Sequence, residues 1–163
     1  MANPQVESKM MGGFLWATGL ANFSLGMISD EDTSLLSKHG KETYFGHYPS
    51  GTSLRCLDHF KQLINTGKFL KYDFGTDENI KRYGVAVPPE YDLTRIKDVP
   101  IALFCGLKDR LASAGDYRWL KEQLSVNNTV KYYREFNLGH CGFLIPPSYE
   151  HLYEIVNLAK QYS

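Results

Sequence analysis

IALFCG, at residues 101–106, is the stretch that decides the predicted fold. Its first five residues form an unbroken apolar run, which is typical of a strand buried on both faces of a parallel sheet. Residues 129–136 alternate between apolar and polar side chains, as a half-covered strand does. Helices are predicted at residues 114–124, with Ser113 as the N-cap, and at residues 148–161. Strand, helix, strand and helix with short connections predict an α/β fold with right-handed parallel pairing.

The residues upstream have a less regular pattern. Residues 1–50 lack sustained periodicity, and short helical pieces are expected within them, including one around residues 30–38. An amphipathic helix then extends from a Thr52 cap to Gly67, with apolar side chains every three or four residues. Residues 68–98 are rich in turn-forming residues, so we expect a long irregular segment there.

Composition limits the classes of function. The chain has 163 residues, enough for one domain that buries about two thirds of the surface exposed by its unfolded form. Lys plus Arg (18) equals Asp plus Glu (18), and no block of like charge occurs that could neutralise a phosphate backbone. A nucleic-acid partner is therefore not expected. With 43% hydrophobic and 13% aromatic residues, the chain is expected to fold.

The cysteines and the apolar stretches indicate whether a cofactor, a membrane span or a signal peptide is expected. Three scattered cysteines allow at most one disulfide and show no spacing typical of a metal or redox site, so no cofactor is expected. Residues 11–28 are apolar enough to raise the question of a signal or membrane segment. Several glycines, together with Asn22 and Ser24, interrupt that stretch. We therefore expect neither an integral membrane span nor a clear signal peptide, and we favour a buried or lid-like segment.

Asp109 and His140 are the candidate catalytic residues. Each lies in a loop just after a predicted strand, and in open parallel sheets the chemistry lies beyond the carboxyl ends of the strands. An acid and a base in this chain order match the last two members of a Ser…Asp…His hydrolase triad. The acid would orient the imidazole, and Gly139 and Gly142 would let the base loop adopt unusual backbone angles. The alternatives are an ordinary turn aspartate and a solvent-facing loop histidine.

Other side chains fit this chemistry less well. The remaining four histidines lie in predicted helices or in the irregular N-terminal stretch, where packing or solvated roles are expected. They are His39, His47, His59 and His151. Cys141 directly follows His140, and a cysteine nucleophile is seldom activated by its neighbour in sequence. A metal site of Asp109, His140 and a third ligand is a further alternative, but no metal-ligand spacing supports it.

Five motifs, in order along the chain, resemble segments of one known family. They are HYPSGTS at residues 47–53, GKF at 67–69, YDFG at 72–75, PPEYDLT at 88–94 and VPIALFCGLKDRLA at 99–112. The family is that of the acid lipases, the gastric lipase and lysosomal acid lipase group, in which the first motif has the form His-Asn-Pro-Ala-Gly-Thr-Ser. The resemblance extends over about residues 44–160 and joins several ordered motifs, so it is specific.

The resemblance implies that the chain is the C-terminal portion of an α/β-hydrolase. Residues 1–50 would be a lid-like irregular and helical region, and residues 51–163 would carry the triad acid Asp109 and the triad base His140. The family hydrolyses carboxylic esters of neutral lipids, triacylglycerols or steryl esters, so a neutral lipid ester or a lipid interface is the implied partner. A secreted or lysosomal setting is implied as well. Gly142 departs from the family pattern, which has an aspartate two residues after the histidine.

The nucleophile of such a triad is not found in the sequence. The family requires Gly-x-Ser-x-Gly on a sharp turn from strand to helix, and no such pentapeptide occurs. The nearest is NFSLG at residues 22–26, where asparagine replaces the first glycine, so Ser24 is a poor candidate. We therefore expect the chain to be inactive alone as an esterase. The alternative is a non-catalytic lipid-binding or partner-binding module derived from a lipase, with the apolar N-terminal stretch as its contact surface.

Overall fold

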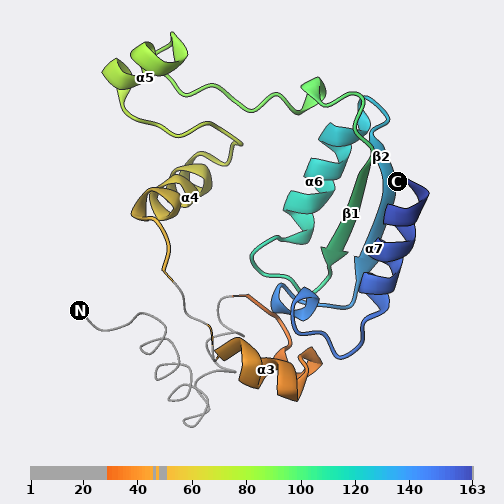
Figure 1. Ribbon diagram of the computed structural model, residues 1–163. Coiled ribbons are helices and arrows are strands. Elements are labelled where there is room, and N and C mark those ends of the chain that lie inside the picture. The colour runs from red at the N-terminus through yellow and green to blue at the C-terminus, as the bar shows by residue number, and fades with distance from the viewer. Residues whose placement is uncertain (1–28, 46, 48–50, 163) are drawn as a thin grey trace. The chain divides into compact units, whose positions relative to one another are not determined.

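The computed structural model describes residues 29–45, 47 and 51–162 of the chain. These residues form two compact units (Figure 1). We call the first the sheet unit; it comprises the described residues up to 47 together with residues 96–162. The second, the helical unit, comprises Gly51–Arg95.

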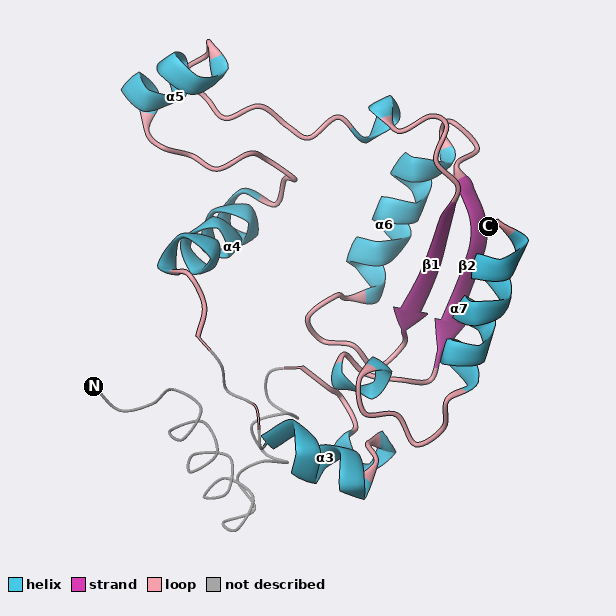
Figure 2. Ribbon diagram, viewed as in Figure 1, coloured by secondary structure: helices cyan, strands magenta, loops and turns pink. Residues whose placement is uncertain are grey.

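The sheet unit is built on two parallel strands. β1 (Ile101–Gly106) pairs with β2 (Val130–Phe136), and α6 (Ala114–Ser125) connects them. Gly106 at the end of β1 lies opposite Phe136 at the end of β2, so the two carboxyl ends meet (Figure 2). The predicted α/β arrangement of strand, helix and parallel strand is confirmed.

α6 covers one face of this sheet. Ser113 caps the helix as predicted, since its Oγ accepts a backbone N–H from the first turn. Tyr117 and Leu124 are buried, as expected for the apolar side of the helix. On the outer side, the Arg118 guanidinium donates to both carboxylate oxygens of Glu135 on β2, at 2.8 and 3.0 Å. Such bidentate pairs add geometric specificity as well as energy, so this contact helps to fix α6 on the sheet.

α7 (Glu150–Gln161) covers the opposite face (Figure 1). The helix begins two residues later than predicted. Arg134 on β2 forms an ion pair with Glu150 at 2.7 Å. His151 is 2% exposed, and one of its ring nitrogens lies 3.2 Å from the Phe143 carbonyl oxygen. Of the two roles predicted for this histidine, packing is confirmed.

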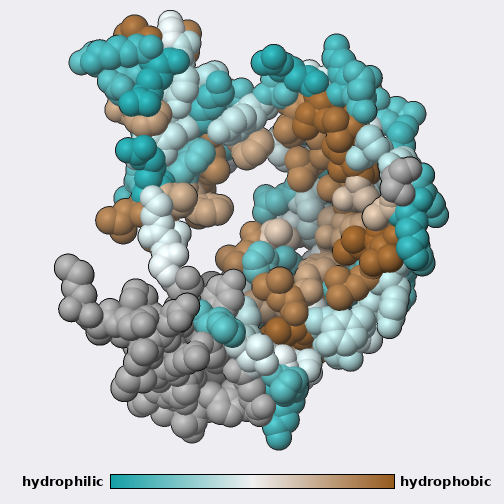
Figure 3. All heavy atoms as spheres, in the orientation of Figure 1, coloured by the Kyte–Doolittle hydropathy of each residue, from teal (hydrophilic) through white to brown (hydrophobic). Residues whose placement is uncertain are grey.

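α7 does not fully close over the sheet. A groove of about 190 Å³ remains between the helix and the strands, and Figure 3 shows hydrophobic residues gathered in this part of the sheet unit. The lining includes Ala102, Phe104, Tyr132, Ile155 and Leu158. The expectation that β1 is buried on both faces is therefore wrong. Ala102 is exposed where it lines this groove, and in the described part of the chain β2 is the only strand that pairs with β1.

The described residues before the strands belong to the same unit. α3 (Lys38–Phe45) follows a short 3-10 turn, η1 (Thr33–Leu35), whose N-cap Asp32 accepts the Ser34 N–H. The expected helix around residues 30–38 is misplaced, since the aspartate side chain stabilises a tight turn there and the α-helix begins later. The lid-like character of the first fifty residues stays a prediction.

α4 (Leu54–Thr66) is the predicted amphipathic helix of the helical unit. It ends, as predicted, at Gly67, whose φ of 62° lies in the left-handed region that favours glycine. Its N-cap is Ser53 and not Thr52, because the Ser53 hydroxyl accepts the Arg55 N–H at 3.2 Å. The predicted cap is therefore wrong by one residue.

α5 (Thr76–Tyr83) and the short η2 (Leu93–Arg95) lie where an irregular segment was expected. Gly75 and Gly84 lie directly before and after α5, and glycines so close together in the sequence predict turns rather than a helix. The charges on α5, however, complement the helix dipole, and this was the signal that could have found it. The acidic residues of the first turn are Asp77 and Glu78, and the basic residues of the last turn are Lys81 and Arg82.

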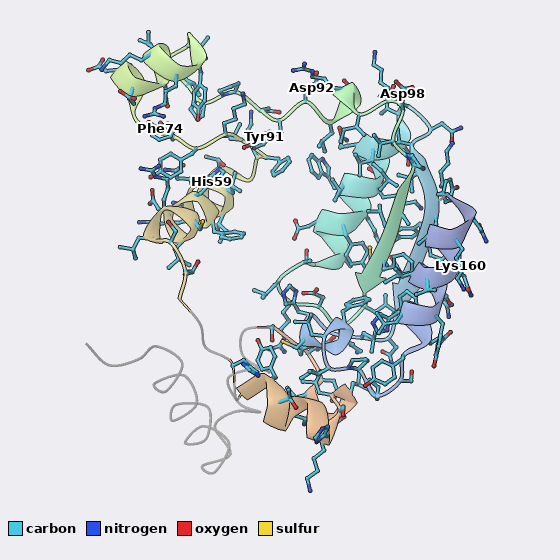
Figure 4. The ribbon with its side chains drawn as sticks, viewed as in Figure 1. His59, Phe74, Tyr91, Asp92, Asp98 and Lys160 are labelled. Carbon is cyan, nitrogen blue, oxygen red and sulfur yellow. The ribbon has the colours of Figure 1, made fainter. Side chains whose placement is uncertain are left out.

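His59 links α4 to the segment that follows it (Figure 4). One of its ring nitrogens lies 2.9 Å from the Leu70 carbonyl oxygen. The ring packs edge-on against Tyr72, with 5.6 Å between centroids, and Tyr72 packs in turn against Phe74 at 4.7 Å. Of the two roles predicted for His59, packing is confirmed.

Asn79 holds the loops around α5 together. Its side chain is almost fully buried, at 1% exposed. Nδ2 donates to Asp73 Oδ1 at 2.7 Å and to the Ala86 carbonyl oxygen at 3.0 Å. Oδ1 accepts the Phe74 N–H at 3.0 Å. One side chain therefore satisfies groups on both sides of the helix.

Asn79→Ala is expected to loosen the helical unit locally, because three partners lose a hydrogen bond at once. A loss of about 2 kcal/mol corresponds to amide exchange about 30-fold faster in α5, which hydrogen-exchange mass spectrometry would measure. Asn157→Ala, at an exposed position of α7, is the control and should leave α5 unchanged. Unaltered exchange in the Asn79 variant would contradict this role.

The ion pair between Glu135 and Arg118 makes the stability of the sheet unit depend on pH under acidic conditions. Hydrogen bonds from Arg118, and next from Tyr133, lower the pKa of Glu135 to about 2 from its ordinary 4.5. The stabilisation is therefore fully present above pH 4.5 and is lost as the pH falls to about 2. Glu135→Gln should flatten the decline in unfolding free energy over that interval, measured by urea titrations at several pH values.

Arg118→Gln provides the matched variant, since it removes the guanidinium that lowers this pKa. It should flatten the same interval, and the double variant should add little further flattening. A decline in Glu135→Gln as steep as that of the parent chain would rule out this carboxylate as the source.

Candidate active site

Two loops meet beyond the carboxyl ends of β1 and β2. The Lys108 N–H donates to the Leu138 carbonyl oxygen at 3.0 Å. Gly106 permits this approach, because a Cβ there would lie 2.6 Å from the same carbonyl oxygen. The pairing of the strands therefore continues into the loops that carry Asp109 and His140.

The structure brings Asp109 and His140 together. His140 Nδ1 lies 3.0 Å from Asp109 Oδ2. The other carboxylate oxygen, Oδ1, accepts the N–H groups of Leu111 and Ala112, both at 2.8 Å. Asp109 is thus a turn aspartate and a histidine partner at once, with one oxygen for each task. Their predicted proximity is observed, and their catalytic roles stay a prediction.

The two side chains differ in their access to solvent. The Asp109 side chain is 7% exposed, whereas that of His140 is 46% exposed. No group in the described part of the chain hydrogen-bonds the second ring nitrogen, Nε2. A held Nδ1 and an accessible Nε2 are the arrangement that a general base requires.

The glycines of the base loop have a different role from the one predicted. Neither Gly139 nor Gly142 has a positive φ, so the expectation of unusual backbone angles is wrong. Close packing is the reason for both. A Cβ on Gly139 would lie 2.9 Å from the Cβ of Asp30 and closer still to its carboxylate, and one on Gly142 would lie 3.1 Å from the Cβ of Leu138.

Cys141 is a packing residue of the base loop. It is 2% exposed, and burial raises the pKa of its thiol, which disfavours the thiolate that a nucleophile needs. Its Sγ lies 3.5 Å from Ser29 Oγ. The other weak candidate for a nucleophile, Ser24, lies outside the described residues.

Sequence reasoning missed Asp30, which is fully buried next to the site. Its Oδ2 accepts the Cys141 N–H at 3.1 Å and the Ser29 hydroxyl at 2.7 Å. Asp30 and Cys141 lie 111 positions apart, and no local pattern in the sequence connects them.

The described residues contain no group of three or more His, Cys, Asp or Glu side chains that could hold a metal ion. The alternative of a metal site at Asp109 and His140 therefore lacks a third ligand within the described ranges. Within those same ranges, no helix has the length and apolar character needed to cross a membrane.

No family model matches the chain, but comparison with known proteins identifies relatives. Lipase member N of Mus musculus is 34% identical over 127 residues, 74% of this chain and 30% of that protein. Gastric triacylglycerol lipase of Bos taurus is 32% identical over 127 residues, 77% of this chain and 31% of that protein. Lipase lipl-3 of Caenorhabditis elegans is 42% identical over 136 residues, 82% of this chain and 33% of that protein. The chain spans about a third of the length of these relatives.

The contact between Asp109 and His140 predicts the tautomer of the histidine. A carboxylate that accepts from Nδ1 favours the neutral tautomer with its proton on Nδ1, which long-range ¹H–¹⁵N NMR of histidine-labelled protein detects at alkaline pH. Asp109→Asn should keep the turn, because its carbonyl oxygen can still accept both backbone N–H groups. Its NH₂ would then face Nδ1, and the proton should move to Nε2. The same tautomer in both proteins would show that Asp109 does not orient the ring.

Proposed function

Because this chain is related over most of its length to the acid lipase family, we propose that it supplies the acid and the base of a Ser–His–Asp lipase triad. Asp109 is the acid and His140 the base. The observation that carries the proposal is the 3.0 Å contact between Asp109 Oδ2 and His140 Nδ1, with the imidazole about half exposed beyond the ends of two parallel strands. The pair lies beyond the carboxyl ends of the strands, which is where active sites are generally found in open α/β sheets.

The proposed chemistry is hydrolysis of a carboxylic ester in two steps. A serine hydroxyl attacks the ester carbonyl while His140 Nε2 accepts the hydroxyl proton, and Asp109 stabilises the imidazolium that forms. His140 then gives the proton to the departing alcohol, which leaves an acyl-serine. A water molecule attacks the acyl group with His140 again as base, and His140 then returns the proton to the serine oxygen as the carboxylic acid leaves. Neutral lipid esters are the proposed substrates, since all three compared relatives are named as lipases and one of them is named as a triacylglycerol lipase.

The serine has to come from polypeptide outside this sequence. No Gly-x-Ser-x-Gly occurs in the 163 residues, and the matched stretch is only about a third of the length of the relatives. We therefore infer that the chain by itself does not turn over esters. Two features support a need for further protein: the apolar strand β1 has a single partner strand in the described ranges, and its Ala102 is exposed.

A second candidate function is a lipid-binding or partner-binding module without catalysis. The observation that favours it is the apolar side of α4, where Leu54 is 82%, Phe60 65% and Ile64 79% exposed. Exposed apolar residues gathered on one helix mark interaction surfaces. The N-terminal stretch that was expected to form the contact surface lies outside the described residues.

An esterase assay on the isolated chain distinguishes both candidate functions, the incomplete triad and the binding module, from a complete enzyme. Purified chain should show no turnover of a short-chain p-nitrophenyl ester and no labelling by a fluorophosphonate probe of activated serines. Turnover that His140→Ala abolishes would contradict the inference that the nucleophile is missing.

A chimera tests the triad itself. Residues 44–162 would replace the matching stretch of Bos taurus gastric triacylglycerol lipase, and the chimera should hydrolyse tributyrin. Asp109→Asn should lower kcat by about 10⁴-fold and His140→Ala by about 10⁶-fold, as loss of the acid and of the base does in other triads. Lys131→Ala, at an exposed position of β2, is the control and should leave kcat within about twofold. Full activity of the His140→Ala chimera would refute the proposal.

A further inference from the structure

We propose that Asp30 is a positioning residue that locks the loop after β1, which carries Asp109 (the acid loop), to the loop after β2, which carries His140 (the base loop), and so keeps His140 within reach of Asp109. This inference rests on the proposed function, since it concerns the geometry of the same acid and base. Asp30 touches neither the imidazole nor any reacting atom, so it would act through its neighbours.

The backbone around Asp30 pairs with the acid loop. Asp30 forms an antiparallel bridge with Asp109. On one side, the Glu31 N–H donates to the Lys108 carbonyl oxygen at 2.9 Å, and on the other the Arg110 N–H donates to the Ser29 carbonyl oxygen at 3.1 Å. The residues before and after Asp109 are therefore both fastened to the segment that carries Asp30.

The side chain of Asp30 fastens the base loop. Its Oδ2 accepts the N–H of Cys141, the residue directly after His140, at 3.1 Å. Hydrogen bonds to a carboxylate are stronger than neutral ones, and the bond lies in a site that is fully buried. The loop cannot move away from the acid loop without breaking it.

The residue before His140 is shaped to fit the same carboxylate. A side chain on Gly139 would overlap the Asp30 carboxyl group, with its Cβ 2.9 Å from the Asp30 Cβ and closer still to the carboxyl carbon and to Oδ1. Asp30 thus contacts the residues on both sides of His140 and leaves the ring itself free. A small residue at position 139 and a carboxylate at position 30 form one complementary pair.

Packing alone does not explain an aspartate at this position. Its Oδ1 is buried and has no hydrogen-bond partner in the described part of the chain, which is unfavourable for folding. An apolar residue of similar size would avoid that cost. What it could not do is accept the Cys141 N–H, so the carboxylate is explained by the contact with the base loop.

The test measures the tautomer of His140 in the full chain by long-range ¹H–¹⁵N NMR. The parent protein should show the Nδ1-protonated form. Asp30→Ala removes the acceptor, and the Nδ1–H signal of His140 should give way to the Nε2–H form that an unheld imidazole prefers. Asp30→Asn retains an acceptor for the Cys141 N–H and should restore the parent spectrum. The amide signals of β1 and β2 show whether the sheet is intact in each variant. A purely structural role for Asp30 would not predict loss of the Nδ1–H signal in Asp30→Ala and its rescue in Asp30→Asn while the sheet stays intact.

Two further variants complete the test. Ser29→Ala removes the hydroxyl that donates to Asp30 but leaves the bond to Cys141, so the His140 signal should stay unchanged. Gly139→Ala displaces the Asp30 carboxylate by overlap and carries the test if Asp30→Ala does not fold; it should lose the Nδ1–H signal.

The outcomes separate this inference from the proposed function. Loss of the Nδ1–H signal in Asp109→Asn, with retention in Asp30→Ala and Gly139→Ala, would overturn the role of Asp30 and leave the acid–base pair intact. Retention of that signal in Asp109→Asn would overturn both. Loss in Asp109→Asn, Asp30→Ala and Gly139→Ala, with rescue in Asp30→Asn, would support both.

Discussion

The parallel pairing of β1 with β2 is the constraint on which the site depends. Parallel strands end at the same edge of a sheet, so the register that sets Gly106 opposite Phe136 also brings the two following loops together. Asp109 and His140 are 31 positions apart in the chain, yet their side chains lie 3.0 Å apart because of that register. The contacts that hold α6 and α7 on the strands therefore contribute to the geometry of Asp109 and His140 as well.

The features that could be predicted from the sequence depend on local patterns. The apolar run of residues 101–105 and the alternation of residues 129–136 indicate strands, and their parallel order places Asp109 and His140 at one edge. The features that could not be predicted depend on contacts between distant residues. Nothing near Asp30 in the sequence points to the base loop, and Gly139 is explained by the space that Asp30 occupies rather than by its own backbone angles.

The chain carries more apolar surface than its described residues cover. Apolar side chains of α4 are exposed, and the groove between α7 and the sheet is lined by apolar side chains. Ala102 on β1 is exposed although its strand has the composition of a fully buried one. The relatives extend well beyond the matched stretch, which is about a third of their length, and exposed apolar surface of this kind marks sites of contact with more protein or with lipid.

The bond between Asp30 and Cys141 has a consequence for the order of folding. It closes a loop of 111 positions, whereas β1 and β2 are joined through a single helix. The entropy lost on closing a loop rises with its length, so the strands are expected to pair before this bond forms. The two strands would then pair early, and the contact between Asp109 and His140 would be fixed last, when the segment around Asp30 reaches it. A chain in which that segment has not yet arrived would have a native-like sheet and an imidazole without a settled orientation.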